Sequence, residues 1–320
     1  MIPLELQREI QVNVATPKDP VTGTLVKNEL ITDPGSPHFT RHVVIDISDT
    51  PMEGNFQAGQ AFGVIPEWEH FTEYNKVKIH SDDHKLRLYS IASPSDGENG
   101  NGQYLSTTVK RVFDEHWDTE ETFLGVCSNY LCDLDPGDTC QVTGPTGKHL
   151  LLPDRENRND YKYVFLATGT GIAPYRGMAM ELLNQGITQD IFLVLGVPYH
   201  TDVLYEDLFE TLEKEHENFH FQRAISRQQT TSNGEKMYVQ NRLLEQEEIY
   251  RSLFQDEDTL VYICGLDGME IGIYRSMLLL GGEDFLANVD DSVNPDELDP
   301  RDEYFQSLQP NKDRTLVEVY

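Results

Sequence analysis

The sequence predicts a two-domain β + α/β protein, in which an antiparallel β-barrel is followed by a doubly wound domain with a parallel sheet. A chain of 320 residues is longer than a single core commonly fills. Its first half alternates short apolar runs with Gly, Pro, Asn and Asp, as antiparallel strands and their turns do. Its second half alternates continuous apolar runs with helical patterns, which is typical of a parallel sheet buried between helices.

The first domain is placed at residues 1–158 and the second at residues 159–320, because the pattern changes at a charged connector. Strands are expected wherever apolar runs lie between turn-forming residues, and helices wherever apolar residues recur every three or four positions. The expected strands are residues 42–47, 61–65, 106–112, 139–142, 163–167, 191–195 and 260–264, and the expected helices are residues 175–183 and 204–215.

The composition excludes several classes of partner. A net charge of −30 disfavours binding to nucleic acid or to an anionic membrane surface, because both are polyanions. Adaptation to a salty environment is an alternative explanation of this charge. No run approaches the ~20 apolar residues that span a bilayer. The N-terminal segment lacks a basic region followed by an apolar run, so a cytoplasmic protein is expected.

Two local patterns are set aside as sites. Cys127 and Cys132 have the spacing that opens a plant-type iron–sulfur signature, but Asp135 stands where the third cysteine would be needed. We therefore predict no metal cluster. The acidic stretch over residues 283–303 contains Pro295 and Pro300, and we expect a solvated loop or insertion there.

A glycine-rich turn marks a candidate nucleotide site. Gly169 and Gly171 follow a predicted buried strand and precede a predicted helix, where a phosphate can bind backbone N–H groups. Pro174 replaces the third glycine of the ordinary dinucleotide fingerprint. Proline suits the first helical turn because its missing N–H has no intrahelical partner there. An ordinary strand–helix turn is the alternative interpretation.

The choice between NADP and NAD depends on the groups available for the ribose 2′ position. No carboxylate follows the strand at residues 191–195, whereas NAD sites usually place Asp or Glu at a strand end. Arg227 and Lys236 can pair with a 2′-phosphate, and Ser226 can donate a hydrogen bond to it. Tyr238 can stack on adenine. NADP(H) is therefore favoured, although cations near turns are often merely solvated.

A second motif, at residues 87–90, carries groups suited to a flavin. On a strand, Arg87 and Tyr89 would face one side, and Leu88 and Ser90 the other. A guanidinium can bind a pyrophosphate with two hydrogen bonds, and a tyrosine ring offers a surface for an isoalloxazine. Tyr320 ends the sequence and could fold back over a flat cofactor and swing away, with Glu318 beside it to pass a proton.

Three segments together resemble the plant-type ferredoxin–NADP(+) reductase family: residues 87–90, residues 169–174 and residues 317–320. The resemblance covers residues 56–320. It implies FAD and NADP(H) as cofactors, hydride transfer between nicotinamide and flavin, and ferredoxin or flavodoxin as the one-electron carrier. Tyr320 would stack on the isoalloxazine at rest and yield to the nicotinamide. Ser90 and Glu318 would position the ring and relay protons, and Cys264 would line the pocket.

The resemblance also implies a set of cofactor-binding residues. Lys110 is expected to contact FAD and also to reach the phosphates of the nicotinamide nucleotide. The expected FAD residues are Arg87, Leu88, Tyr89, Ser90, Thr108, Val109, Lys110, Val126, Cys127 and Ser128. The other expected cofactor-binding residues are Thr168, Thr170, Val197, Pro198, Ser226, Arg227, Lys236, Tyr238, Gln240, Gly265 and Leu266.

The sequence departs from the family's pattern in a few places. Asp114 stands where related reductases carry a tyrosine that stacks on the FAD adenine, and Phe113, His116 or Trp117 could substitute for it. The stretch at residues 67–84 is longer and more acidic than expected. Only a small basic patch is available for an acidic ferredoxin: Lys85, Arg87, Lys110 and Arg111.

Two other functions remain open at this point. A reductase component of an oxygenase that oxidises NADPH would use the same sites with a different partner. A sensor that binds a flavin or a nucleotide would lack the hydride-transfer residues, yet Ser90, Cys264, Glu318 and Tyr320 are all present.

Overall fold

The structure is a computed structural model that describes residues 10–66, 85–115, 122–290 and 292–320. The chain divides into two compact units. The barrel unit comprises residues 10–151 together with residues 176–181. The α/β unit comprises residues 152–175 and 182–320. The domain boundary proposed at residues 158 and 159 stays a prediction.

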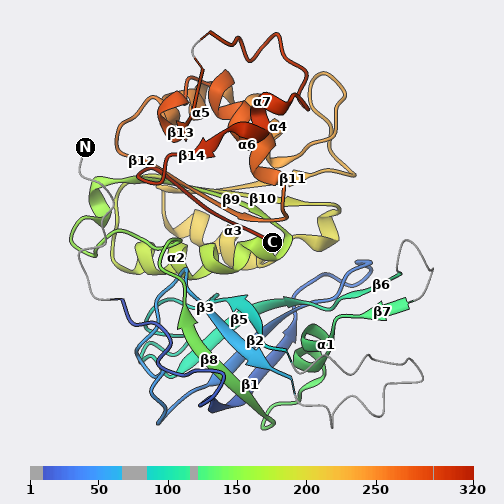
Figure 1. The fold of residues 1–320 in the computed structure, drawn as a ribbon, viewed down its shortest axis with the longest axis vertical. Helices are drawn as coiled ribbons and strands as arrows, with labels where there is room; N and C mark the ends of the chain where they lie inside the picture. The colour runs from blue at the N-terminus through green and yellow to red at the C-terminus, as the bar shows by residue number, and fades with distance from the viewer. Residues whose placement is uncertain (1–9, 67–84, 116–121, 291) are drawn as a thin grey trace. The chain divides into compact units, whose positions relative to one another are not determined.

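The barrel unit is built on an antiparallel sheet (Figure 1). Within the described residues this sheet has six strands in the order β4-β3-β8-β1-β2-β5. A hydrogen bond of 2.8 Å from Thr107 Oγ1 to the Ser90 carbonyl and a bridge between Ile91 and Thr107 join its two edges. Its elements are β1 (Val21–Leu30), β2 (Thr40–Asp46), β3 (Ala61–Ile65), β4 (Arg87–Ser90), β5 (Tyr104–Lys110), the hairpin β6 (Phe113–Glu115) and β7 (Thr122–Leu124), α1 (Val126–Asp133) and β8 (Thr139–Thr146).

The α/β unit contains a parallel sheet, of five strands in the described part of the chain, in the order β11-β10-β9-β12-β15. β10 and β12 are buried along their whole length, because helices cover both faces of the sheet. Figure 1 shows α2 and α3 on one face and α4, α5 and α6 on the other. Its elements are β9 (Lys162–Thr168), α2 (Ile172–Asn184), β10 (Ile191–Val197), α3 (Glu206–Glu215), β11 (Phe219–Ile225), α4 (Val239–Glu245), α5 (Glu247–Phe254), β12 (Thr259–Gly265), α6 (Met269–Leu279), β13 (Leu286–Ala287), α7 (Glu303–Ser307), β14 (Gln309–Pro310) and β15 (Thr315–Val319).

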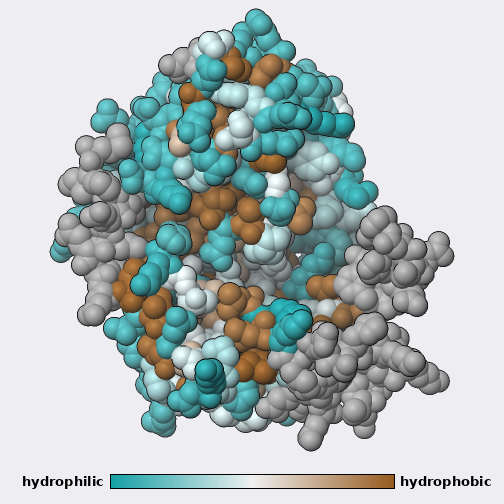
Figure 2. Space-filling view, in the orientation of Figure 1, coloured by the Kyte–Doolittle hydropathy of each residue, from teal (hydrophilic) through white to brown (hydrophobic). Residues whose placement is uncertain are grey.

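The predicted fold class is confirmed, and each predicted strand and helix overlaps an observed one. The acidic stretch at residues 283–303 is only partly a solvated loop, since Phe285 and Leu286 at its start are buried in the core of the α/β unit. No helix in the described residues is long and apolar enough to cross a membrane. Hydrophilic residues cover much of the face seen in Figure 2, in keeping with the net charge of −30.

A buried histidine gives the barrel unit a predictable response to acid. Burial, followed by the nearby Arg176 guanidinium, lowers the pKa of His42 from 6.5 to about 4. The unfolded chain therefore binds more protons than the folded one between these two values, and stability is lost as the pH falls through that window. We expect a loss of about 3 kcal/mol in the free energy of unfolding by pH 4. Denaturant titrations between pH 7 and pH 4 measure it.

The variant His42→Asn is the control for this prediction. It removes the titrating group, so its free energy of unfolding is expected to change less with pH over the same window. Glu98 causes a further loss of stability at lower pH. Burial alone would raise the pKa of Glu98, but Arg176 lowers it overall, so stability falls as the Glu98 carboxylate becomes protonated. Parallel pH profiles for the wild type and His42→Asn would contradict the assignment to His42.

Candidate functional site

The turn between β9 and α2 is pressed against the end of β12. Residues Gly169–Gly171 form one turn of 3-10 helix, and Gly169 has a φ of 52°. A Cβ on Gly171 would lie 2.2 Å from the carbonyl oxygen of Cys264, which is main chain and cannot turn away. Glycine at position 171 is therefore required for the two strand ends to approach each other.

A hydrogen bond joins the same two strand ends. The backbone N–H of Leu266 donates to Thr168 Oγ1 at 2.9 Å. Gly265 lies beneath this hydroxyl with a φ of 145°, and a Cβ there would lie 2.2 Å from it. The predicted cofactor residues Thr168, Thr170, Gly265 and Leu266 thus come together at the carboxyl edge of β9 and β12, where ligands of open α/β sheets bind.

The C-terminal residue is attached to this edge. β15 runs parallel to β12 and places Glu318 opposite Cys264. The backbone N–H of Tyr320 donates to the Gly265 carbonyl at 2.9 Å, and its hydroxyl lies 2.8 Å from Thr170 Oγ1. The Tyr320 side chain is also 58% exposed, so an aromatic ring sits at the turn between β9 and α2 with a face open to solvent.

The acid–base groups at this edge have shifted pKa values. Burial by neighbouring atoms raises the pKa of the Glu318 carboxyl, although the residue as a whole is exposed to solvent. The Cys264 side chain is fully buried; burial, and then the charge of Glu318, raise the pKa of its thiol. A carboxyl with a raised pKa holds a proton closer to neutral pH, which suits a proton relay.

The proposed 2′-phosphate residues all lie in the segment that joins β11 to α4. The N–H of Ser226 donates to the Val197 carbonyl at 2.9 Å, and the N–H of Arg227 donates to the Pro198 carbonyl at 3.0 Å. Lys236 is exposed on the segment that leads into α4. Within the described residues, the structure gives neither Arg227 nor Lys236 an ion pair, so both remain available to an anion.

Two further nucleotide residues are placed by α4. Tyr238 precedes the helix and is 45% exposed, so its ring is accessible for stacking. Gln240 is half-buried, and its side chain lies against Gly272 of α6, where a Cβ would be 2.9 Å from the amide carbon. Whether these two residues bind a nucleotide stays a prediction.

In the barrel unit, β4 carries the proposed flavin motif beside β5. Arg87 is exposed, and its guanidinium donates to the carbonyls of Lys85 and Leu86 at 3.1 Å and 3.3 Å. The structure shows it no carboxylate partner among the described residues, in a chain with 55 acidic residues. Tyr89 packs against the barrel core, where burial raises the pKa of its hydroxyl, while the Leu88 side chain is 58% exposed.

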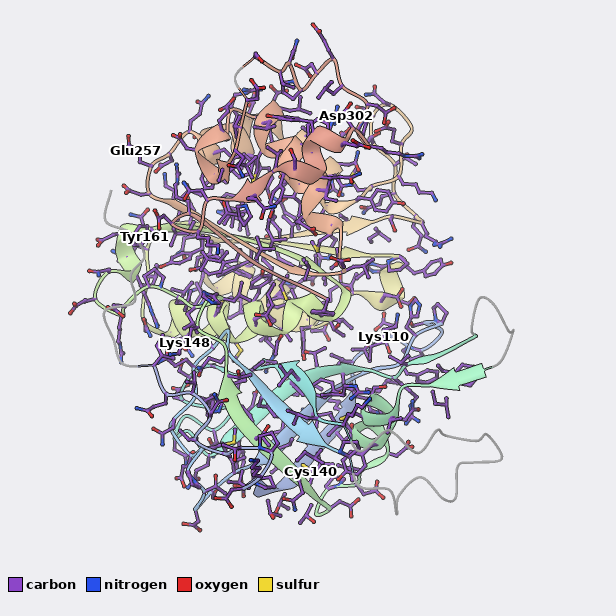
Figure 3. The ribbon with its side chains drawn as sticks, viewed as in Figure 1. Lys110, Cys140, Lys148, Tyr161, Glu257 and Asp302 are labelled. Atoms are coloured by element: carbon purple, nitrogen blue, oxygen red, sulfur yellow. The ribbon has the colours of Figure 1, made fainter. Side chains whose placement is uncertain are left out.

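Some of the remaining residues predicted to bind FAD have accessible side chains, whereas others could contact it only through the main chain. Val109 and Cys127 are buried in the core, so any contact they make is through the backbone. The Ser128 hydroxyl already accepts from the Val112 N–H at 3.2 Å and donates to the Gly125 carbonyl. Thr108 is buried in β5, Val126 begins α1, and Lys110 is exposed at the end of β5 (Figure 3).

The start of α1 can bind an anion. The helix begins after Gly125 without a side-chain cap, and the N–H groups of its first turn have no intrahelical acceptor. Phe113 is the adenine-stacking candidate whose side chain the structure describes, and it is 68% exposed on β6. His116 and Trp117 lie outside the described residues, as do the Asp114 side chain and the acidic stretch at residues 67–84.

Comparison with known proteins places the chain among oxidoreductases. Residues 165–274 match the model of the oxidoreductase NAD-binding domain. The chain is 41% identical to the chloroplastic leaf isozyme 1 of ferredoxin–NADP reductase from Arabidopsis thaliana, over 86% of this chain and 74% of that protein. It is 38% identical to the ferredoxin–NADP reductase of Spirulina sp., over 86% and 91% of the two chains. The solved structure of ferredoxin–NADP(+) reductase from Plasmodium falciparum superposes with a TM-score of 0.69 at 25% identity, covering 96% and 99% of the two chains.

Proposed function

The chain belongs to the ferredoxin–NADP reductase family, and we propose that it exchanges electrons between NADP(H) and ferredoxin or flavodoxin through bound FAD. The observation that carries this proposal is the position of Tyr320, whose hydroxyl contacts Thr170 in the turn that starts α2. An aromatic residue at a nucleotide turn can cover the nicotinamide site and leave it when the nucleotide binds. The relatives named above do not favour the oxygenase-component alternative.

The barrel residues suit FAD. The exposed Arg87 guanidinium, Lys110 and the first turn of α1 supply cations and N–H donors for a pyrophosphate. Tyr89, which packs against the barrel core, offers a ring face for the isoalloxazine, and Ser90 is proposed to position the reacting edge. When bound, FAD supplies two-electron chemistry with the nicotinamide and one-electron chemistry with the carrier protein.

The residues at the edge of β9 and β12 orient the nicotinamide and handle protons. We propose that Thr168, Thr170, Gly265 and Leu266 line the nicotinamide site, with Cys264 beneath them. Glu318 is proposed to hold a proton at its carboxyl and to pass it between solvent and the site, in line with its raised pKa. Ser226, Arg227, Lys236 and Tyr238 are proposed to bind the 2′-phosphate and the adenine.

We also propose a cytoplasmic location for this protein. One of the relatives named above is chloroplastic. Fractionation of the native host cells tests this location.

Replacing Tyr320 with serine tests the covering role of the terminal ring. The ring and the nicotinamide are proposed to compete for one surface, so Tyr320→Ser is expected to bind NADP(+) at least about tenfold more tightly and to release it more slowly. Equilibrium titration of the oxidised protein with NADP(+) measures the change. Tyr320→Phe keeps the ring and is the control. An unchanged dissociation constant in Tyr320→Ser would rule out the covering role.

An anaerobic titration of the purified protein with NADPH, and separately with NADH, tests the proposed function. Rapid bleaching of a yellow protein by NADPH and slow bleaching by NADH would support FAD, hydride transfer and the proposed phosphate site together. A colourless protein would overturn the FAD assignment. Bleaching by NADH alone would overturn the phosphate site, and reoxidation by ferredoxin or flavodoxin then tests the carrier.

A further inference from the structure

Helix α2 forms a bidentate ion pair with the loop that follows β4. Arg176 Nη1 donates to Glu98 Oε1 at 2.5 Å, and Nη2 donates to Oε2 at 3.1 Å. Nη1 also donates to the carbonyl of Ala92 at 2.9 Å. Arg176 is buried and Glu98 is half-buried, so water and salt weaken this pair less than a surface pair.

The Glu98 carboxylate is held on its other sides as well. Ser106 Oγ donates to Oε1 at 2.6 Å, and His42 Nε2 lies 3.5 Å from the same oxygen. Both neighbours belong to strands of the barrel, β5 and β2. The loop that carries Glu98 is therefore fixed to the barrel independently of α2, and Arg176 is attached to a rigid acceptor.

Two more contacts attach α2 to the same loop. A Cβ on Gly177 would lie 2.3 Å from the carbonyl oxygen of Ser93, so the helix backbone packs directly on the loop backbone. The N–H and the hydroxyl of Ser95 both donate to Glu181 Oε2, at 2.9 Å and 2.6 Å. These contacts, like the ion pair, lie within the barrel unit, to which residues 176–181 belong.

The ion pair joins α2 to the loop after β4, and each of these two segments directly follows proposed cofactor residues. α2 starts directly after Gly169–Gly171, in the α/β unit, and its middle turns group with the barrel. The loop that Arg176 binds follows directly on Arg87–Ser90, the strand with the proposed flavin residues. Neither Arg176 nor Glu98 belongs to a motif that the sequence pattern reveals.

We propose that Arg176 and Glu98 are positioning residues for hydride transfer: their ion pair holds the middle of α2 to the segment that follows the flavin-binding strand. This inference rests on the proposed function, because it assumes transfer between a nicotinamide and a flavin. In this proposal both residues act through α2. Displacement of about 1 Å at reacting atoms costs roughly a hundredfold in rate, so a loosened helix slows the transfer.

The test follows flavin reduction by NADPH in anaerobic stopped-flow experiments on the holoenzyme. Arg176→Gln is expected to reduce the rate by about tenfold to a hundredfold. Arg176→Lys keeps the charge without the planar fork and is expected to show a smaller reduction. The affinity for 2′-phospho-AMP is expected to stay unchanged in both variants, because Arg227 and Lys236 lie outside the ion pair.

Arg223→Gln is the matched control. Arg223 pairs with Glu206 and Glu210 at 2.6 Å each, and these contacts join β11 to α3 wholly within the α/β unit. Its loss removes a comparable ion pair without touching the attachment of α2 to the barrel loop. Arg223→Gln is therefore expected to lower the melting temperature while leaving the rate of flavin reduction within about twofold of the wild type.

The titration of His42 is a second readout, independent of activity. His42 faces Glu98 and Arg176, with Lys27 and Glu29 further along β1. With the guanidinium gone and the Glu98 carboxylate left in place, the pKa of His42 is expected to rise from about 4 in Arg176→Gln. NMR titration of the imidazole protons measures it, and an unchanged value would overturn the ion pair itself.

The outcomes separate the inference from the function on which it rests. A wild-type holoenzyme that NADPH does not reduce overturns the proposed function. Reduction of the wild type, with Arg176→Gln equally fast, overturns the positioning role and leaves the function standing. If Arg176→Gln does not fold, Arg176→Lys decides: a slower rate at an unchanged melting temperature supports the proposal, and the wild-type rate overturns it.

Discussion

Alanine at position 171 is expected to abolish useful binding of NADP(H) and to destabilise the α/β unit. The added Cβ would lie 2.2 Å from the carbonyl oxygen of Cys264 and 2.7 Å from the Cα of Gly265. Both atoms are main chain at the end of a central strand, so no side-chain rotation relieves the clash. Either β12 or the turn must move, at a cost of about 3 kcal/mol.

Movement of the turn is what links this cost to binding. In the variant, the turn moves to relieve the clash. A nucleotide that binds only the native turn must force it back, and the free energy needed lowers the affinity by about a hundredfold. Calorimetric titration with NADP(+) and denaturant unfolding measure the two effects. Gly169→Ala is the control in the same turn: its Cβ meets nothing within 4 Å, and its φ of 52° costs about 1 kcal/mol. Equal losses in the two variants would contradict the steric argument.

The strands that could be predicted are those whose burial leaves a pattern in the sequence. Residues 163–167, 191–195 and 260–264 are continuous apolar runs because helices cover both faces of these strands. The structure confirms all three as β9, β10 and β12. The helix at residues 172–184 is predictable over its middle turns for the same reason, since its apolar face packs on the sheet.

Other elements could not be predicted because distant partners determine them. β15 is only five residues long and mixes apolar residues with a glutamate, and its pairing with β12 makes it a strand. β1 has few buried positions, and α1 carries polar residues among its buried ones. Local sequence preference is weak for such segments, and tertiary contacts decide their structure.

The candidate site, like the fold, could be predicted only in part from the sequence. Resemblance to a family assigns residue types to positions, and so it indicates Thr170 and Tyr320. It does not predict that their hydroxyls meet at 2.8 Å across 150 residues of sequence, nor that Arg176 reaches Glu98 across 78. It also implies hydroxyl contacts to FAD near α1, where the Ser128 hydroxyl is already bonded to the main chain. Such contacts depend on the packing of whole elements, which no local motif records.

Removing the two cations proposed for the 2′-phosphate is expected to abolish most of the preference for NADPH. A hydrogen bond to a charged group contributes about 1.5–3 kcal/mol, so Arg227→Gln and Lys236→Gln should each weaken NADPH binding by roughly tenfold to a hundredfold. The double variant is expected to lose most of its selectivity. NADH lacks the 2′-phosphate, and its kcat/KM should stay within about twofold of the wild type.

The acidic character of the chain sharpens this expectation. In a protein of net charge −30, a 2′-phosphate that has lost its two cations meets a surface that repels it, so the penalty exceeds that of two missing hydrogen bonds. The repulsion is screened by salt, and added NaCl should restore part of the NADPH affinity of the double variant while weakening that of the wild type. Lys214→Gln, which removes an exposed cation paired with Glu210 on α3, is the control and should change neither cofactor's kcat/KM. A proportional loss with NADPH and NADH would instead place Arg227 and Lys236 against a part of the nucleotide that both cofactors share.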